Sequence, residues 1–137
     1  HFFFKERWYG FDDGIYAAAR LLEILAGDLH GRSPEEIFAT LPKSISTPEL
    51  KVDLAEGEHY RFMDRLRERA SFEDASVISI DGLRVDWPDG WGLVRASNTT
   101  PVLVLRFEAD TEAALKRIQQ LFRQQMLAVD PALKLPF

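Results

Sequence analysis

Three turn motifs divide residues 76–108 into short apolar segments and limit what this chain can fold into. The motifs are Asp81-Gly82, Pro88-Asp89-Gly90 and the polar run Ser97-Asn98-Thr99-Thr100-Pro101. Asp-Gly and similar turns are typical of connections between strands that run in opposite directions. The apolar and β-branched residues between the turns favour strands. The pattern therefore predicts antiparallel strands over 76–80, 83–87, 92–95 and 101–108.

Segments on either side of these strands complete the predicted domain. Residues 49–54 alternate apolar and charged side chains, which predicts a further strand. Helical periodicity predicts one helix over 58–71 and another from Asp110 or Thr111 to about 128. Their expected inward residues are Phe62, Met63, Leu66 and Ala70 in the first helix and Leu115, Ile118, Leu121, Phe122 and Met126 in the second. The order predicts an α+β fold, an antiparallel sheet with two helices on one face.

The sequence pattern of the first third of the chain differs from that of the predicted sheet and favours helices. The aromatic run Phe2–Phe4 predicts a short buried strand. Asp12 or Asp13 is expected to cap a helix that ends near residue 26, and we prefer this to a metal or acid–base role because no third ligand lies nearby. Ser33-Pro34-Glu35-Glu36 has the spacing of a capping box with proline in the first turn, and predicts a second helix that ends near Leu41-Pro42.

Two domains are expected from this change of pattern. Residues 43–47 are polar and lack periodicity, which is typical of a linker. We interpret residues 1–43 as the tail of a preceding α/β domain and residues 44–137 as a complete small domain. We expect these residues to be part of a longer protein, because a strand at Phe2–Phe4 without a partner would leave an exposed edge and a large apolar face.

Composition excludes several classes of function. The 137 residues are 46% hydrophobic and 28% charged, with a net charge of −5. An acidic chain is a poor match for nucleic acid or for an anionic membrane surface, and no apolar run has transmembrane length. The sequence has no cysteine, so disulfides, thiolate metal sites and cysteine nucleophiles are excluded. A cytoplasmic location is the default expectation.

The polar run after residue 94 carries the densest set of hydrogen-bond donors in the chain. Arg95 is followed by the Ser97, Thr99 and Thr100 hydroxyls and the Asn98 amide. A turn of this kind can direct backbone N–H groups and side-chain donors at one point, which suits a phosphate dianion. The alternative is an ordinary hairpin loop, since Ser, Asn, Thr and Pro are turn residues in any case.

A resemblance to a known family favours the phosphate site. Gly92–Pro101, followed by Val104–Ala109, resembles the phosphate-binding loop of the C-terminal domain of the α-D-phosphohexomutase family of bacterial phosphomannomutases/phosphoglucomutases. The similarity extends to Lys5–Gly14, to Asp81–Asp86 and to the terminal Pro136-Phe137. It implies a C-terminal domain with a fold like that of the TATA-box-binding protein.

The resemblance also implies a role for the loop. Arg95, Ser97, Asn98, Thr99 and Thr100 would bind the substrate phosphate of a hexose phosphate or a hexose 1,6-bisphosphate, and the domain would close the active-site cleft. The family uses a phosphoserine and a Mg²⁺ ion held by aspartates, both in other domains. Neither motif occurs in these 137 residues. We therefore expect this chain to hold no cofactor or metal, to be inactive alone and to work with the N-terminal domains of the same enzyme.

Two further residues have alternative interpretations. Arg106 either supports the loop as a second phosphate ligand or pairs with an acid such as Glu108 or Asp86. His1 would be the last residue of the family's sugar-recognition loop, or else a frayed terminus. Apart from the mutase, a non-catalytic α+β interaction or small-ligand regulatory module is the main alternative function. A third possible function is that of an active enzyme formed when this chain associates with a separate N-terminal chain, with Phe2–Phe4 as the interface.

The remaining aromatic and imidazole side chains are assigned structural roles. Trp87 and Trp91 flank the turn at 88–90, and packing on the hairpin is the commoner fate of such residues than sugar binding. His30 and His59 lie among polar residues and are expected at the surface.

Overall fold

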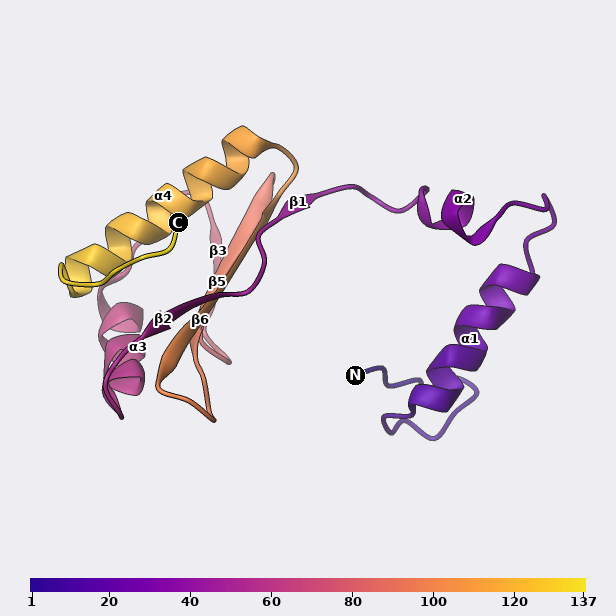
Figure 1. Ribbon diagram of the computed structural model, residues 1–137, viewed down its shortest axis with the longest axis horizontal. Coiled ribbons are helices and arrows are strands. Elements are labelled where there is room, and N and C mark those ends of the chain that lie inside the picture. The colour runs from indigo at the N-terminus through magenta and orange to yellow at the C-terminus, as the bar shows by residue number, and fades with distance from the viewer. The chain divides into compact units, whose positions relative to one another are not determined.

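A computed structural model describes all 137 residues, which form two units, His1–Pro42 and Lys43–Phe137. The first unit holds helices α1 (Gly14–Ala26) and α2 (Pro34–Phe38). The second holds the strands β1 to β6 and the helices α3 and α4 (Figure 1).

Both helices of the first unit begin at the predicted caps. The Asp13 carboxylate accepts hydrogen bonds from the N–H groups of Ile15 and Tyr16, which confirms Asp13 as the cap of α1. Ser33 and Glu36 form the predicted reciprocal capping box of α2. The end of α2 was predicted too late: the helix stops at Phe38, and tighter turns follow, with hydrogen bonds from Thr40 to Ile37 and from Leu41 to Phe38. Pro42 disfavours helical backbone at Leu41, so the helix does not resume after these turns.

The predicted strand at Phe2–Phe4 is not formed. A single bridge pairs Phe3 with Asp12, and the side chains of Phe2 and Phe3 are 67% and 66% exposed. A strand requires a ladder of paired backbone groups, and residues 1–42 contain no second extended segment that offers one. The expectation of a buried strand is therefore wrong for the structure of this chain.

The second unit is built on a sheet in which every pair of neighbouring strands is antiparallel. The strand order is β1-β6-β5-β4-β3, and β2 also pairs with β6. The strands are β1 (Ile45–Ser46), β2 (Leu50–Asp53), β3 (Ser76–Ile78), β4 (Leu83–Trp87), β5 (Gly90–Ala96) and β6 (Val102–Ala109). The three predicted turns are confirmed, since β3 to β6 follow one another as hairpins.

Residues 43–47 are more than a linker. Ile45 pairs with Ala109 and Ser46 with Glu108, so β1 lies along the same edge of β6 as β2. Thr47 extends the contact through hydrogen bonds to Phe107, one from its own N–H and one to its hydroxyl. Two residues of strand are too short to leave a periodic pattern, which is why the sequence did not predict this element.

The two helices of this unit cover one face of the sheet. Helix α3 (Glu58–Arg69) and helix α4 (Glu112–Val129) lie on the same side of the strands in Figure 1. Alternate strand residues point at them, so that Val85, Val94, Leu105 and their neighbours are buried with the apolar faces of both helices. The fully buried aromatic side chains are Phe62, Phe107 and Phe122. The other face carries the intervening residues, which include Arg84, Arg95 and Arg106.

Candidate phosphate-binding loop

The loop Ser97–Pro101 connects β5 to β6, and its two ends are fixed by backbone hydrogen bonds. The Ser97 N–H donates to the Val102 carbonyl at 3.0 Å, and the Val102 N–H donates to the Thr100 carbonyl at 2.8 Å. The Leu54 N–H, just after β2, donates to the Pro101 carbonyl at 2.9 Å. The loop therefore sits on a rigid base between two long strands.

The Ser97 hydroxyl organises the inside of this loop. It accepts hydrogen bonds from the N–H groups of Thr99 and Thr100, each at 3.3 Å. It also lies 3.1 Å from the Thr100 hydroxyl and 3.4 Å from that of Thr99. Ser97 is only 9% exposed, so its side chain faces into the loop. The Asn98, Thr99 and Thr100 side chains are exposed, and these three residues offer donors on the outer side.

Arg95 is the next-to-last residue of strand β5, directly before the loop. Its side chain is half-buried and makes no ion pair or hydrogen bond with the rest of the chain. Gly82, in the preceding hairpin turn, has a φ of +95°, and a Cβ placed on it would lie 2.6 Å from the Arg95 Cβ. The Asp81-Gly82 turn thus packs directly against the base of Arg95, and only glycine fits there.

Arg106 lies on the helix-free face of the sheet, like Arg95, but farther from the loop. It is opposite Leu93 in the register, whereas Arg95 is opposite Val104. The alternative, an ion pair between Arg106 and Glu108 or Asp86, is not formed in this structure. Asp86 is held instead by Arg84, whose guanidinium donates to it at 2.7–3.1 Å, and Arg106 makes no ion pair. The role of Arg106 as a second phosphate ligand stays a prediction.

The predicted structural roles of the two tryptophans are confirmed. Trp87 packs edge-on against Phe72 and Phe122, and its indole N–H donates to the Glu73 carbonyl at 3.2 Å. Trp91 lies under the Arg84 guanidinium, which is 4.1 Å from its ring centre. Both indoles are therefore engaged by their own domain.

Two residues at the start of α3 were missed by the sequence analysis. The Tyr60 hydroxyl donates to the Ser97 carbonyl at 3.4 Å. His59, predicted at the surface, is only 2% exposed and its ring centre lies 4.0 Å from that of Tyr60. Helical spacing could have predicted the burial of His59, because this residue falls on the same helix face as Phe62 and Leu66.

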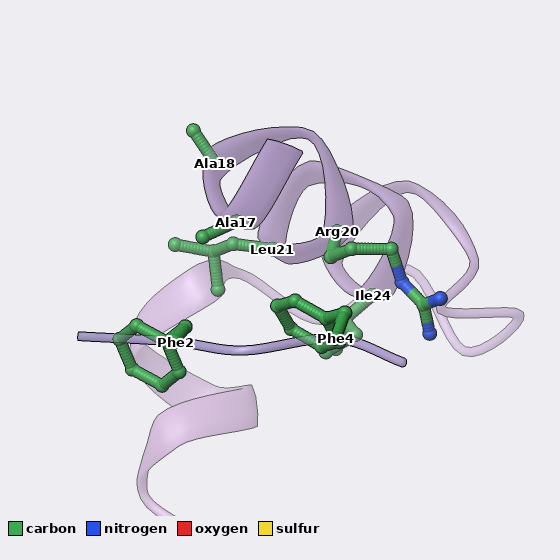
Figure 2. A pocket seen from close by; sticks show the side chains of 7 residues that line it. All are labelled: Phe2, Phe4, Ala17, Ala18, Arg20, Leu21 and Ile24. Carbon is green, nitrogen blue, oxygen red and sulfur yellow. The ribbon is translucent and has the colours of Figure 1, made fainter. Parts of the chain in front are cut away.

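The candidate sugar contact His1 lies in the first unit. His1 hydrogen-bonds to the Asp12 carboxylate, which also accepts from the Phe2 N–H. An apolar hollow of ≈ 370 Å³ lies between the N-terminal segment and α1 (Figure 2). Figure 2 shows the rings of Phe2 and Phe4 beside Leu21 and Ile24. The Arg20 guanidinium lies over the Phe4 ring, 5.4 Å from its centre. A hollow of this composition suits apolar groups rather than an anion.

No three His, Cys, Asp or Glu side chains are grouped so that they could hold a metal ion. No helix is both long enough and apolar enough to span a bilayer.

Comparison with protein families decides where this chain belongs. A family model described as the C-terminal domain of phosphoglucomutase/phosphomannomutase matches residues 49–125. The chain belongs to the phosphoglucomutase/phosphomannomutase family. The matched residues span from β2 through most of α4, so they include the loop and both helices that pack on the sheet.

Relatives of the phosphoglucomutase/phosphomannomutase family match along almost the entire chain. The phosphomannomutase/phosphoglucomutase of Pseudomonas putida is 57% identical over 137 residues, which is 100% of this chain and 29% of that protein. The phosphoglucomutase of Neisseria meningitidis serogroup A is 60% identical over 125 residues, or 90% of this chain and 26% of the relative. The chain thus spans less than a third of the length of these relatives.

A solved structure supports the same assignment. The crystal structure of a phosphoglucomutase/phosphomannomutase family protein from Burkholderia thailandensis is 53% identical and has a TM-score of 0.84. The similarity covers 98% of this chain and 28% of that chain. The predicted family resemblance and the predicted α+β fold are both confirmed.

Proposed function

We propose that this chain is the phosphate-binding C-terminal part of a phosphohexomutase that interconverts hexose 1-phosphate and hexose 6-phosphate through a bisphosphate. The supporting observation is Arg95, a half-buried guanidinium without a carboxylate partner, next to the exposed donors of Asn98, Thr99 and Thr100. A guanidinium beside several N–H and O–H donors is what a phosphate dianion requires.

In this proposal the loop holds the phosphate that is not being transferred. Phosphoryl transfer depends mainly on positioning and electrostatics, so a clamp on the distal phosphate affects the rate. Each charge-assisted hydrogen bond from Arg95 or the loop would contribute about 1.5–3 kcal/mol. Residues 95–100 include no aromatic ring or carboxylate that would recognise a sugar. A loop that contacts only phosphate accepts the substrate in either orientation, and closing it over the cleft would exclude water.

The bond-making chemistry is assigned to other parts of the enzyme. The side chains of this chain do not fit a Mg²⁺ site, because no group of three potential ligands comes together. We propose that the metal and the phosphoserine belong to the N-terminal domains, with which this chain cooperates. The first unit would be the tail of the preceding α/β domain, and the boundary would fall near residue 43.

A backbone NMR titration of the 137-residue chain with glucose 1-phosphate tests the proposal. We expect shifts in residues 95–100 with the phosphosugar and none with glucose. Arg95→Ala should remove most of the response. Arg69→Ala is the matched control, because it deletes the same charge from the far end of α3. Arg106→Ala in the same titration determines whether that residue is a second ligand.

Two results would contradict the proposal. Equal shifts with glucose and glucose 1-phosphate would mean that the loop does not recognise phosphate. No phosphosugar-specific shift in residues 95–100, in this chain and in the full-length enzyme, would favour the alternative of a non-catalytic interaction or regulatory module.

A further inference from the structure

We propose that Tyr60 is a positioning residue for the phosphate loop, an inference that rests on the proposed function. Its hydroxyl comes from the first turn of α3 and donates to the Ser97 carbonyl at 3.4 Å. No other side chain outside the loop hydrogen-bonds to residues 97–100. Tyr60 therefore makes the one side-chain hydrogen bond between helix α3 and the loop.

The carbonyl that Tyr60 holds determines where one phosphate donor points. The Ser97 carbonyl and the Asn98 N–H belong to the same peptide unit, and this chain has no cis peptide bond. In a trans peptide the C=O and N–H vectors are antiparallel. A bond that holds the Ser97 carbonyl toward α3 therefore directs the Asn98 N–H away from α3, to the exposed side of the loop. The Asn98 N–H has no partner within the chain, so it is available to an anion.

The other polar groups of Ser97 are already fixed. Its N–H donates to the Val102 carbonyl, and its hydroxyl accepts from Thr99 and Thr100. The carbonyl is the remaining group, and Tyr60 is its partner. Without that bond the peptide unit between residues 97 and 98 can rotate while the rest of Ser97 stays in place, and the Asn98 N–H would lose its fixed direction.

The Tyr60 ring is itself held in place by a buried neighbour. His59 packs against it with ring centres 4.0 Å apart and is almost inaccessible to solvent. Both residues lie in the first turn of α3, where His59 is buried and Tyr60 is 45% exposed. The loop peptide is thus linked to helix α3 through Tyr60, whose ring packs on the buried His59. Tyr60 does not need to touch the substrate, so its effect should appear in phosphosugar affinity rather than in turnover.

The test compares Tyr60→Phe with Tyr16→Phe. Both variants delete a hydroxyl that donates to a backbone carbonyl, but Tyr16 bonds to Arg7 at 3.1 Å in the other unit. Tyr60→Phe keeps the ring that packs on His59, so the fold should be retained. We expect glucose 1-phosphate to bind Tyr60→Phe about two- to tenfold more weakly, the range for one neutral hydrogen bond. We also expect a lower NMR order parameter at the Asn98 amide before ligand is added. Tyr16→Phe should show neither change.

The outcomes separate this inference from the proposed function. If phosphosugar-specific shifts persist at wild-type affinity in Tyr60→Phe, with an unchanged Asn98 order parameter, the positioning role is wrong and the phosphate site stands. If Tyr60→Phe lowers order parameters throughout the sheet, the residue is only part of the core packing, and the inference again fails. If the wild-type protein shows no phosphosugar-specific shift, the proposed function fails and Tyr60 has no phosphate site to position.

Discussion

Arg95 is the residue on which the proposed phosphate site depends most. It brings a permanent positive charge to the edge of the loop, and no carboxylate of the chain neutralises it. We predict that Arg95→Ala leaves the fold intact and lowers kcat/KM for the phosphosugar by on the order of 10–1000-fold in the full-length enzyme. Steady-state kinetics with glucose 1-phosphate measures this, and Arg69→Ala serves as the charge-matched control. Near-normal catalytic efficiency would remove Arg95 from the site.

Gly82 sets the position of Arg95 from the neighbouring hairpin. An added Cβ would meet the Val94 carbonyl and the Arg95 side chain, and the residue also requires a left-handed backbone. We predict that Gly82→Ala destabilises the domain by roughly 1–3 kcal/mol and weakens phosphosugar binding as well. Urea unfolding measures the first effect and the NMR titration the second.

Gly57→Ala is the matched control for that substitution. Gly57 also has a positive φ of 78°, but nothing lies within 4 Å of where its Cβ would be. The Gly57→Ala variant should therefore lose stability through backbone strain alone and keep its phosphosugar affinity. If both variants bind equally well, the Asp81-Gly82 turn does not position Arg95.

Helix α2 offers a prediction at the level of one element, because its capping box titrates. The Ser33 N–H donates to the Glu36 carboxylate at 2.7 Å, and this hydrogen bond lowers the pKa of Glu36 below its ordinary value of 4.5. A lowered folded-state pKa stabilises the helix above the unfolded-state value, and the contribution is lost as the pH falls through the folded-state pKa. We predict that the helical Cα chemical shifts of Pro34–Phe38 diminish below pH 4.5.

Substitution of neighbouring glutamates tests whether the capping box is responsible. Glu36→Gln removes the titrating group, so the acid-induced change in α2 should disappear. Glu35→Gln lies in the same turn without the reciprocal bond to Ser33 and should behave like the wild-type chain. An identical acid response in all three proteins would assign the change to another group.

Structural elements that form through interactions between residues close in sequence were predictable. Elements that need a strand partner far away in the sequence were not. The caps Asp13, Ser33 and Thr111 and the hairpin turns act over a few residues, and all are found where the sequence indicates them. Whether β1 and the Phe2–Phe4 segment form strands depends on whether a partner strand exists elsewhere in the chain. The sequence also could not predict that the Ser97 hydroxyl points into the loop, because that orientation follows from the geometry of the closed loop.

At the scale of the whole molecule, the two units differ in how much they bury. The unit Lys43–Phe137 contains every buried residue of the chain, whereas none of residues 1–42 is buried. Burial of apolar surface is the main source of folding free energy, so the two units should differ strongly in stability. The large exposed side chains of Phe2, Tyr9, Ile15 and Leu29 contribute little to the first unit.

We therefore predict that the units unfold separately. In native-state hydrogen exchange the amides of α1 and α2 should exchange at low free energies, while those of β5, β6 and α4 should exchange only through global unfolding. The same difference should appear as two urea transitions, with residues 1–42 lost first. A fragment comprising 43–137 should then keep the second transition and the phosphosugar response of the full chain. One cooperative transition shared by all amides would mean that the units stabilise each other, and it would contradict a domain boundary near residue 43.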